Sequence, residues 1–289
     1  MADYHELLDR VERILERAEH WFPTPPAQAD WRRAAAFRWR RVGARGFLEG
    51  VPHPHRIRLA DLHGIDDQKA DLVRNTRQFL AGLPANNVLL WGARGTGKSS
   101  LIKALLTRFR SDGLRLIQVN KEHLLDLPDL LPLLEPRPER FVVFADDLSF
   151  AAGDAGYRAL KAVLEGAVSA LPDNVLLYAT SNRRHLLPET IQENLETRLV
   201  EQEIHHGEGV EEKISLSERF GLWLAFHPFS QERYLEIVFH WLKRMKTPVP
   251  DREAVLRAAL QWALTRGSRS GRVAWQFARD WAGRTGLRA

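Results

Sequence analysis

The sequence predicts an α/β fold, in which a parallel sheet of five strands is flanked by helices and followed by a helical C-terminal region. Short, continuous apolar runs alternate with helical patterns over the middle of the chain. A glycine-rich turn follows the first of these runs, and the segments past Pro228 have helical periodicity. Continuous apolar runs without strict alternation are typical of strands covered on both faces, as in a parallel sheet.

The N-terminal part, residues 1–56, is predicted to be a helical region. Apolar residues recur at helical intervals over residues 3–20, and a proline-rich break follows. A second helix is predicted over residues 27–42, AQADWRRAAAFRWRRV, which end near two glycines. Residues 47–60 are predicted to be a connector.

Residues 57–228 are predicted to form the α/β domain, and residues 229–289 a helical lid. The expected strands are residues 88–91, 114–119, 141–145, 175–180 and, as a weaker pattern, 222–226. The expected helices of the α/β domain cover residues 66–81, the stretch from the glycine turn to about 110, and about 156–170. Those of the lid cover about 230–245, 251–265 and 271–282.

Composition limits the classes of function. The chain holds no cysteine, which excludes disulfides and thiolate chemistry. No apolar run approaches the length of a membrane span, and the first residues lack the order of a secretory signal, so we expect a cytoplasmic protein without a membrane span. The net charge is +5, and eight arginines but a single acid lie between Trp31 and Arg58.

The glycine-rich turn, GARGTGKS at residues 92–99, fits the pattern GxxxxGK[ST] between a predicted strand and a predicted helix. Glycines let successive backbone N–H groups turn inward around phosphate oxygens, and the helix that follows adds its positive end. Lys98 is expected to neutralise the β- and γ-phosphates, and the Ser99 hydroxyl to hold Mg²⁺. An ordinary glycine-rich turn is the alternative. The predicted phosphate-binding residues are Gly92, Ala93, Arg94, Gly95, Thr96, Gly97, Lys98, Ser99 and Ser100.

Two acids follow the third predicted strand, in FVVFADDLSF. Asp146 is the expected Mg²⁺ partner, and Asp147 is placed to orient or deprotonate an attacking water. The alternative is an Asp-Asp pair that caps a turn. Many P-loop ATPases carry Glu where this chain has Asp147, and the shorter side chain leaves slow hydrolysis open.

These features resemble an AAA+ ATPase. The amino-acid sequence most resembles an uncharacterised bacterial branch, the domain-of-unknown-function 815 family. The resemblance spans most of residues 57–282. The matching stretches are NTRQFLAGLPANNVLLWGARGTGKSSLIKALL, FVVFADDLSF, GYRALKAVLEG, LPDNVLLYATSNRRHLLPE, SLSERFGLWLAFHPFSQERYLEIV and GSRSGRVAWQFARDW.

The resemblance implies a role for two polar residues beyond the acid pair. Asn182, in ATSNRR, matches the sensor-1 residue, which contacts the γ-phosphate or the attacking water. Arg219, in LSERFG, resembles the arginine finger, which reaches the nucleotide of a neighbouring subunit and therefore implies a head-to-tail homo-oligomer. A turn asparagine and a salt-bridged surface arginine are the alternatives.

Two further matches concern the lid and the base. Arg272 resembles the sensor-2 arginine, although Arg269 could take that role. Gly64 and Ile65, in DLHGIDDQK, resemble the segment that passes the adenine. The chain departs from the family at Ala151 and Ala152, because acids usually follow the DDLSF stretch. This departure also leaves slow hydrolysis open.

Two other segments allow more than one interpretation. Residues 31–41, WRRAAAFRWRR, could bind nucleic acid or an anionic membrane surface, or could pack their aromatic rings on a neighbouring helix, which we favour. His205 and His206 lie among acids in residues 200–215; we favour a loop that contacts substrate or the next subunit over a metal site.

The sequence therefore predicts an ATP- and Mg²⁺-dependent, oligomeric ATPase that remodels or loads an unidentified macromolecule. A slow nucleotide-gated switch or scaffold, whose assembly ATP sets, is the alternative. A P-loop kinase is a third class, disfavoured because the sequence shows no separate arginine-bearing lid for an acceptor and because Arg219 resembles a finger.

Overall fold

A computed structural model describes residues 29–43, 45–151, 153–166, 171–184, 186, 198–200, 203–205 and 216–287. The helix predicted over residues 3–20 and His206 lie outside these ranges, and for His205 only the backbone is described. Two short strands, β7 (Arg198–Val200) and β8 (Glu203–His205), form a separate antiparallel pair, so part of the segment 200–215 predicted as a loop is a strand.

The central sheet has seven strands, which corrects the prediction of five. Their order across the sheet is β2-β1-β4-β5-β6-β3-β9, and every pairing is parallel except that of β1 with β2. The five predicted strands are all present and lie next to one another in this order. The strands are β1 (Ala36–Val42), β2 (Arg45–Gly50), β3 (Val88–Gly92), β4 (Leu114–Val119), β5 (Arg140–Ala145), β6 (Val175–Ser181) and β9 (Leu222–Phe226).

The helix predicted over residues 27–42 is wrong, because its second half is strand β1, which turns back as β2. Phe37 and Trp39 are buried on one face of β1, whereas Arg38 and Arg40 are exposed on the other. This alternation has the period of a strand. The hairpin extends the sheet by pairing β1 with the free edge of β4.

The aromatic rings of this segment pack rather than face solvent, as favoured from the sequence. The Trp31 ring lies 4.4 Å from that of Phe37, and the Trp39 indole N–H donates to the buried carboxylate of Asp126 at 2.9 Å. The same carboxylate accepts a hydrogen bond from Arg41. Phe37 and Trp39 are therefore not available to stack on nucleic-acid bases. The exposed arginines of the segment could still contact phosphates.

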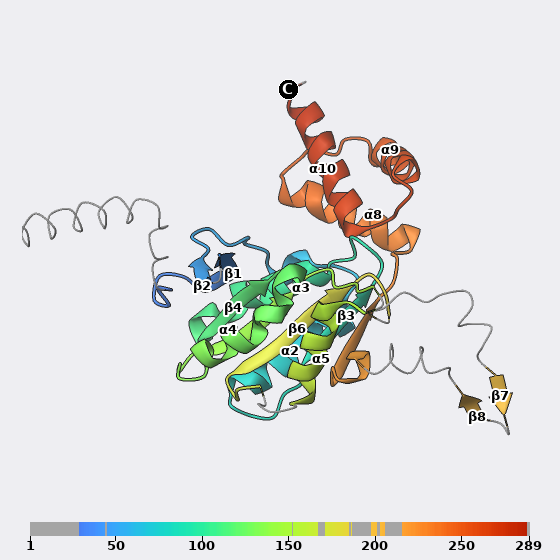
Figure 1. The fold of residues 1–289 in the computed structure, drawn as a ribbon. Coiled ribbons are helices and arrows are strands. Elements are labelled where there is room, and N and C mark those ends of the chain that lie inside the picture. The colour runs from blue at the N-terminus through green and yellow to red at the C-terminus, as the bar shows by residue number, and fades with distance from the viewer. Residues whose placement is uncertain are drawn as a thin grey trace, which may run out of the picture.

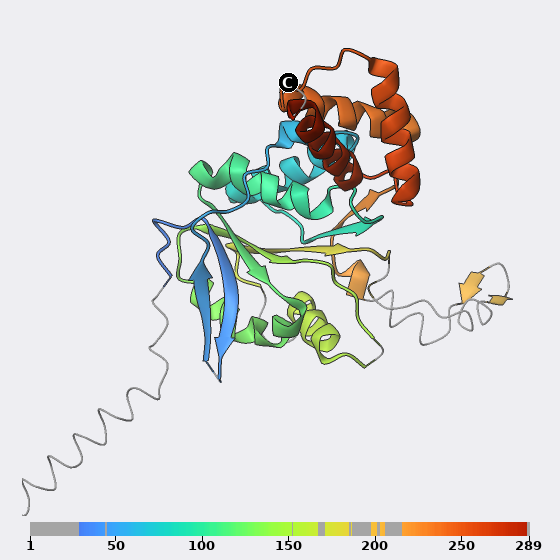
Figure 2. The ribbon, with the colours of Figure 1, turned by 90° about the horizontal axis from the view of Figure 1, so that it is seen from above.

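Helices cover both faces of the sheet (Figures 1 and 2). One face carries α2 (Asp66–Leu80) and α3 (Lys98–Phe109), and the other carries α4 (Leu127–Leu134) and α5 (Ala155–Glu165). Short 3-10 turns complete the connections: η1 (Leu59–Asp61), η2 (Arg110–Asp112) and η3 (Lys121–Asp126). Strands buried on both faces explain why they appear as continuous apolar runs.

Three helices close the chain, as predicted: α8 (Gln231–Arg244), α9 (Arg252–Thr265) and α10 (Gly271–Gly286). Each begins at a side chain that accepts a backbone N–H, from Ser230, Asp251 and Ser270 respectively. They lie on the α2/α3 side of the sheet (Figure 2). Within the described residues, no helix combines the length and the apolar character needed to cross a bilayer.

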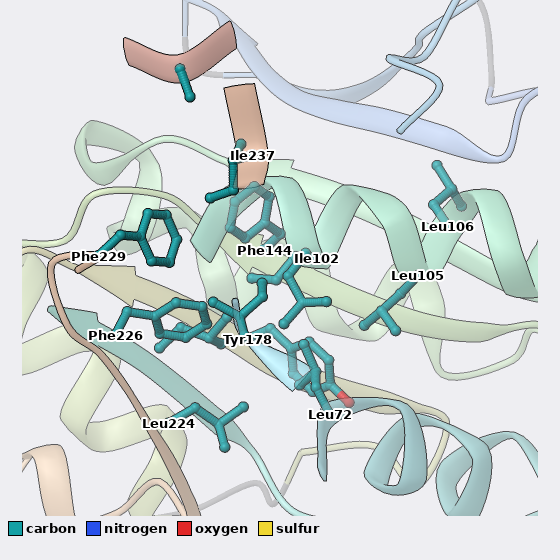
Figure 3. Packing of buried hydrophobic residues seen from close by; sticks show 14 of the residues in the cluster. Leu72, Ile102, Leu105, Leu106, Phe144, Tyr178, Leu224, Phe226, Phe229 and Ile237 are labelled. Carbon is teal, nitrogen blue, oxygen red and sulfur yellow. The ribbon is translucent and has the colours of Figure 1, made fainter. Parts of the chain in front are cut away.

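The larger core joins the C-terminal helices to the sheet. Figure 3 shows Phe226 and Phe229, which end and follow β9, packed near Ile237 of α8 and Ile102 of α3. Phe226 is 2 % exposed and Ile237 is 3 % exposed. Because the carboxyl end of β9 meets α8 in this core and the Arg272 N–H of α10 donates to Gly95, α8 and α10 stand beside the glycine-rich loop.

Candidate functional site

The glycine-rich loop connects β3 to α3 through backbone conformations that favour glycine. Gly92 has a φ of +128°, and a Cβ on it would lie 2.0 Å from the carbonyl oxygen of Phe226. Gly97, which caps α3, has a φ of +107°. Side chains at these positions would strain the backbone or collide with β9, so the glycines are required by the path of the loop. The N-terminus of α3 points its free N–H groups into the space that the loop surrounds.

Lys98, the first residue of α3, is buried beneath this loop. Its Nζ donates to the carbonyl oxygens of Gly92 at 2.7 Å and Ala93 at 2.8 Å, and to the side-chain oxygen of Asn182 at 3.1 Å. Burial lowers the pKa of Lys98 to about 8, while the carboxylates of Asp147 and Asp146 oppose this shift. An anion in the loop is therefore met by an ammonium that the chain holds in a fixed position.

Ser99 and the two acids meet at the carboxyl end of the sheet. The Ser99 hydroxyl donates to Asp146 Oδ1 at 2.6 Å, and the Thr180 hydroxyl donates to the same oxygen at 2.6 Å. Thr180 also accepts the backbone N–H of Asp147 at 2.8 Å. Thr180 was not predicted from the sequence, although it is the penultimate residue of β6, and the parallel pairing of β6 with β5 places it beside the acids that follow β5.

Asp147 is bound to Asn182. It has a left-handed backbone, with a φ of 54°, a conformation that Asp tolerates better than most residues. Its side chain accepts a hydrogen bond from the Asn182 amide, whose oxygen in turn accepts from Lys98. Asn182 therefore connects the lysine of the loop to the acid predicted to act on water.

These residues line one cavity of about 690 Å³, a size typical of small-molecule sites. The polar end holds Lys98, Ser99, Asp146, Asp147 and Asn182. The rest of the lining, here called the apolar end, comes from the loop before α2 and from the C-terminal helices, and it also includes His55, Asp61 and His63. Its apolar lining is Ile57, Leu62, Ile65, Phe229, Ile237, Trp241 and Trp275.

The tryptophans and Phe229 at the apolar end were not predicted. They come from segments more than a hundred residues from the loop, so no local pattern identifies them. Ile65, predicted to pass the adenine, lines this end. Gly64 does not line it; a Cβ there would lie 2.8 Å from the Arg233 side chain, so this glycine permits close packing against α8.

The structure separates the two candidate lid arginines. Arg272 lines the cavity, and its backbone N–H donates to the Gly95 carbonyl at 3.3 Å, whereas Arg269 does not line it. Arg219 lies outside the cavity lining, before the start of β9, and pairs with Glu165 of α5 at 3.0 Å. Within one chain, Arg219 is therefore not brought to the site.

The donor set fits a nucleoside triphosphate with magnesium. The Ser99 hydroxyl and the Asp146 carboxylate supply the oxygen ligands that Mg²⁺ prefers, already within hydrogen-bond distance of each other. The loop supplies backbone N–H groups and an ammonium, which suit phosphates. The apolar end, with two tryptophans, suits a planar base.

Comparison with known proteins gives a family and a fold. Residues 32–285 match the family described as "Protein of unknown function (DUF815)", and no curated protein sequence matches the chain. Among solved structures, the RuvB Holliday junction branch migration motor of Thermotoga maritima is similar, with 18 % identity and a TM-score of 0.51. So is the Aeropyrum pernix ORC1 protein in complex with DNA, with 16 % identity and a TM-score of 0.55.

The alignments cover most of this chain but less of the two solved proteins. They include 77 % of this chain and 63 % of RuvB, and 78 % of this chain and 61 % of ORC1. The chain thus spans less than two thirds of either protein. Both have the AAA+ fold, and at these identities the likeness establishes that fold alone.

Proposed function

The chain belongs to the DUF815 family and has the AAA+ fold, and from this premise we propose that it is a magnesium-dependent ATPase that works as a cytoplasmic homo-oligomer. One observation carries the proposal. The glycine-rich loop, the buried Lys98 and the Ser99–Asp146 pair all face one cavity whose far end is apolar. Triphosphate, metal and base each have a matching part of this cavity.

In this proposal the chain's residues bind and position ATP. The loop N–H groups and Lys98 hold the phosphates, while Ser99 and Asp146 hold Mg²⁺, which neutralises charge on the phosphate oxygens. Ile65, Trp241 and Trp275 enclose the base. The Thr180 hydroxyl fixes the Asp146 carboxylate in the orientation that binds the metal.

Hydrolysis is assigned to Asp147 and Asn182. Asp147 accepts the proton of the attacking water, and Asn182 orients the γ-phosphate or that water. The present hydrogen bond between the two side chains holds Asp147 toward Asn182. The second oxygen of the Asp147 carboxylate stays available to water, so the second candidate, a slow nucleotide-gated switch, rests on the shorter reach of Asp at this position.

The oligomer and the lid complete the proposal. Arg219 is 46 % exposed and lies away from its own cavity, as a residue that serves a neighbouring subunit must. Head-to-tail assembly delivers it to the next nucleotide. The three C-terminal helices act as a lid, and Arg272 couples their position to the nucleotide. The work performed on an unidentified macromolecule follows from lid movement.

Phosphate release tests the proposed function. Purified protein should release phosphate from ATP in Mg²⁺ and should stop when EDTA removes the metal. Fast, sustained turnover supports the ATPase that remodels or loads a macromolecule. Turnover so slow that ATP stays bound supports the nucleotide-gated switch. If small-molecule acceptors become phosphorylated in place of phosphate release, the chain is a kinase. Folded protein that neither binds nor hydrolyses ATP contradicts all three.

Thr180→Val should lower the affinity of the site for Mg²⁺ without removing the fold. Valine has nearly the same shape, but it leaves the Asp146 carboxylate without one donor and the Asp147 N–H without an acceptor. Partners of metal ligands typically contribute about tenfold or more to metal affinity, so the Mg²⁺ concentration for half-maximal turnover should rise about tenfold. A Mg²⁺ titration measures this.

Thr180→Ser is the matched variant, because it keeps the hydroxyl and removes only a methyl group. It should restore the Mg²⁺ dependence of the wild type. If serine and valine shift the titration equally, the methyl packing matters and the hydroxyl does not position Asp146.

A further inference from the structure

Arg94 belongs to the predicted phosphate-binding loop, but the proposed function uses only the backbone N–H groups there and assigns no role to its charged side chain. It is the third residue of the loop, is exposed, and lines the cavity. It makes no ion pair or hydrogen bond through its side chain with any residue that the structure describes. By contrast, Arg219 pairs with Glu165, and Arg184 lies 5.7 Å over the Trp91 ring. Arg94 therefore presents free guanidinium donors to whatever fills the cavity.

The loop places Arg94 at one end of the cavity. A Cβ on Gly97 would lie 3.5 Å from Ile65, so the last part of the loop faces the apolar end. The first part faces the opposite end, because the Ala93 carbonyl accepts from Lys98 Nζ at 2.8 Å, and the same Nζ donates to Asn182. The peptide group that carries this carbonyl joins Ala93 to Arg94. Arg94 thus starts beside Lys98 and Asn182, where the terminal phosphate belongs.

The electrostatics of this end agree with that placement. Arg94 and Arg272 line the same cavity as Lys98 and the two acids. Three cations therefore repel one another around a space that holds two carboxylates. An added phosphate group, with its metal, relieves this repulsion more than a diphosphate does, because its charge lies nearest to all three.

We propose that the Arg94 guanidinium binds the terminal phosphate of the ATP held by its own subunit, so that the loop itself distinguishes a triphosphate from a diphosphate. The proposal rests on the proposed function of the site. A guanidinium matches phosphate oxygens with two parallel N–H donors. Arg94 and Arg219 then divide the work: Arg94 recognises the triphosphate within each subunit, and Arg219 acts only after assembly.

Separate affinities for ATP and ADP test this. Both are measured with Mg²⁺ by calorimetry in an Asp147→Asn background, which prevents hydrolysis during the titration. Arg94→Ala should weaken ATP binding about tenfold to a hundredfold, the range of a hydrogen bond to a charged group, and should change ADP binding less than about threefold. Arg94→Lys should keep part of the preference, since it keeps the charge but not the two-donor geometry.

The matched control is Arg183→Ala, which removes an exposed arginine that does not line the cavity. It should leave both affinities unchanged. The ATP effect of Arg94→Ala should be the same below and above the protein concentration at which oligomers form. Equal losses for ATP and ADP, no loss, or a loss seen only in oligomers overturns the proposal. Absence of nucleotide binding in the Asp147→Asn parent and the wild type would instead overturn the proposed function.

Discussion

Lys98→Ala is expected to abolish ATP turnover and to weaken ATP binding by at least about a hundredfold, from the loss of charged hydrogen bonds to two phosphates. Lys98 is 7 % exposed, and its ammonium donates to the carbonyl oxygens of Gly92 and Ala93. Burying this charge is unfavourable in free energy, and the charge of a bound polyphosphate offsets that penalty. Equilibrium binding and phosphate release measure the two effects.

Two further variants separate charge from geometry. Lys98→Arg keeps a positive charge, but a guanidinium is larger than the ammonium that fits between the two carbonyls, so turnover should also be lost. Lys243→Ala removes an exposed ammonium from α8 and should behave as the wild type. A Lys98→Ala protein that binds and hydrolyses ATP normally would show that the loop is not a phosphate site.

Arg219→Ala is expected to leave ATP binding unchanged and to reduce turnover about a thousandfold, the lower end of the range for arginine fingers. Binding survives because Arg219 lies outside the cavity of its own chain, paired with Glu165. Turnover falls because growing negative charge in the transition state loses its cation. Phosphate release in an assembled sample measures the effect, with affinity measured separately.

Mixing experiments test whether Arg219 acts between subunits. Lys98→Ala subunits keep Arg219 but neither hydrolyse ATP nor bind it tightly, and Arg219→Ala subunits bind ATP but lack the arginine. A mixture should recover part of the activity that each lacks alone. Lys161→Ala is the matched control, because Lys161 lies 3.8 Å from the same Glu165. Unchanged turnover in the assembled Arg219→Ala protein would remove the in-trans role.

The polar end of the site could be predicted from the sequence because its parts are local. Lys98 and Ser99 lie in one loop, and Asp146 directly follows a strand. Parallel strands bring their carboxyl ends to one edge, so the acids and Asn182 meet the loop in the structure. The apolar end could not be predicted in this way. Trp241 and Trp275 reach it only through the packing of the C-terminal helices.

The N-terminal hairpin shows why a local pattern can mislead. Trp31, Phe37 and Trp39 are spaced by even numbers, which fits one side of a strand as well as one side of a helix. Tertiary contacts decide in favour of the strand, because β1 finds the free edge of β4 and Asp126 accepts from Trp39. The sequence signal for a strand was the alternation of an aromatic residue, Trp39, with Arg38 and Arg40, which the structure shows as buried and exposed in turn.

Calorimetry of nucleotide binding to the wild-type chain tests the central claim, that the loop, Lys98 and the Ser99–Asp146 pair form a triphosphate and magnesium site. The account predicts binding of ATP that strengthens when Mg²⁺ is added and weakens when EDTA removes it. Folded protein that shows no magnesium-dependent affinity for adenine nucleotides would contradict the account.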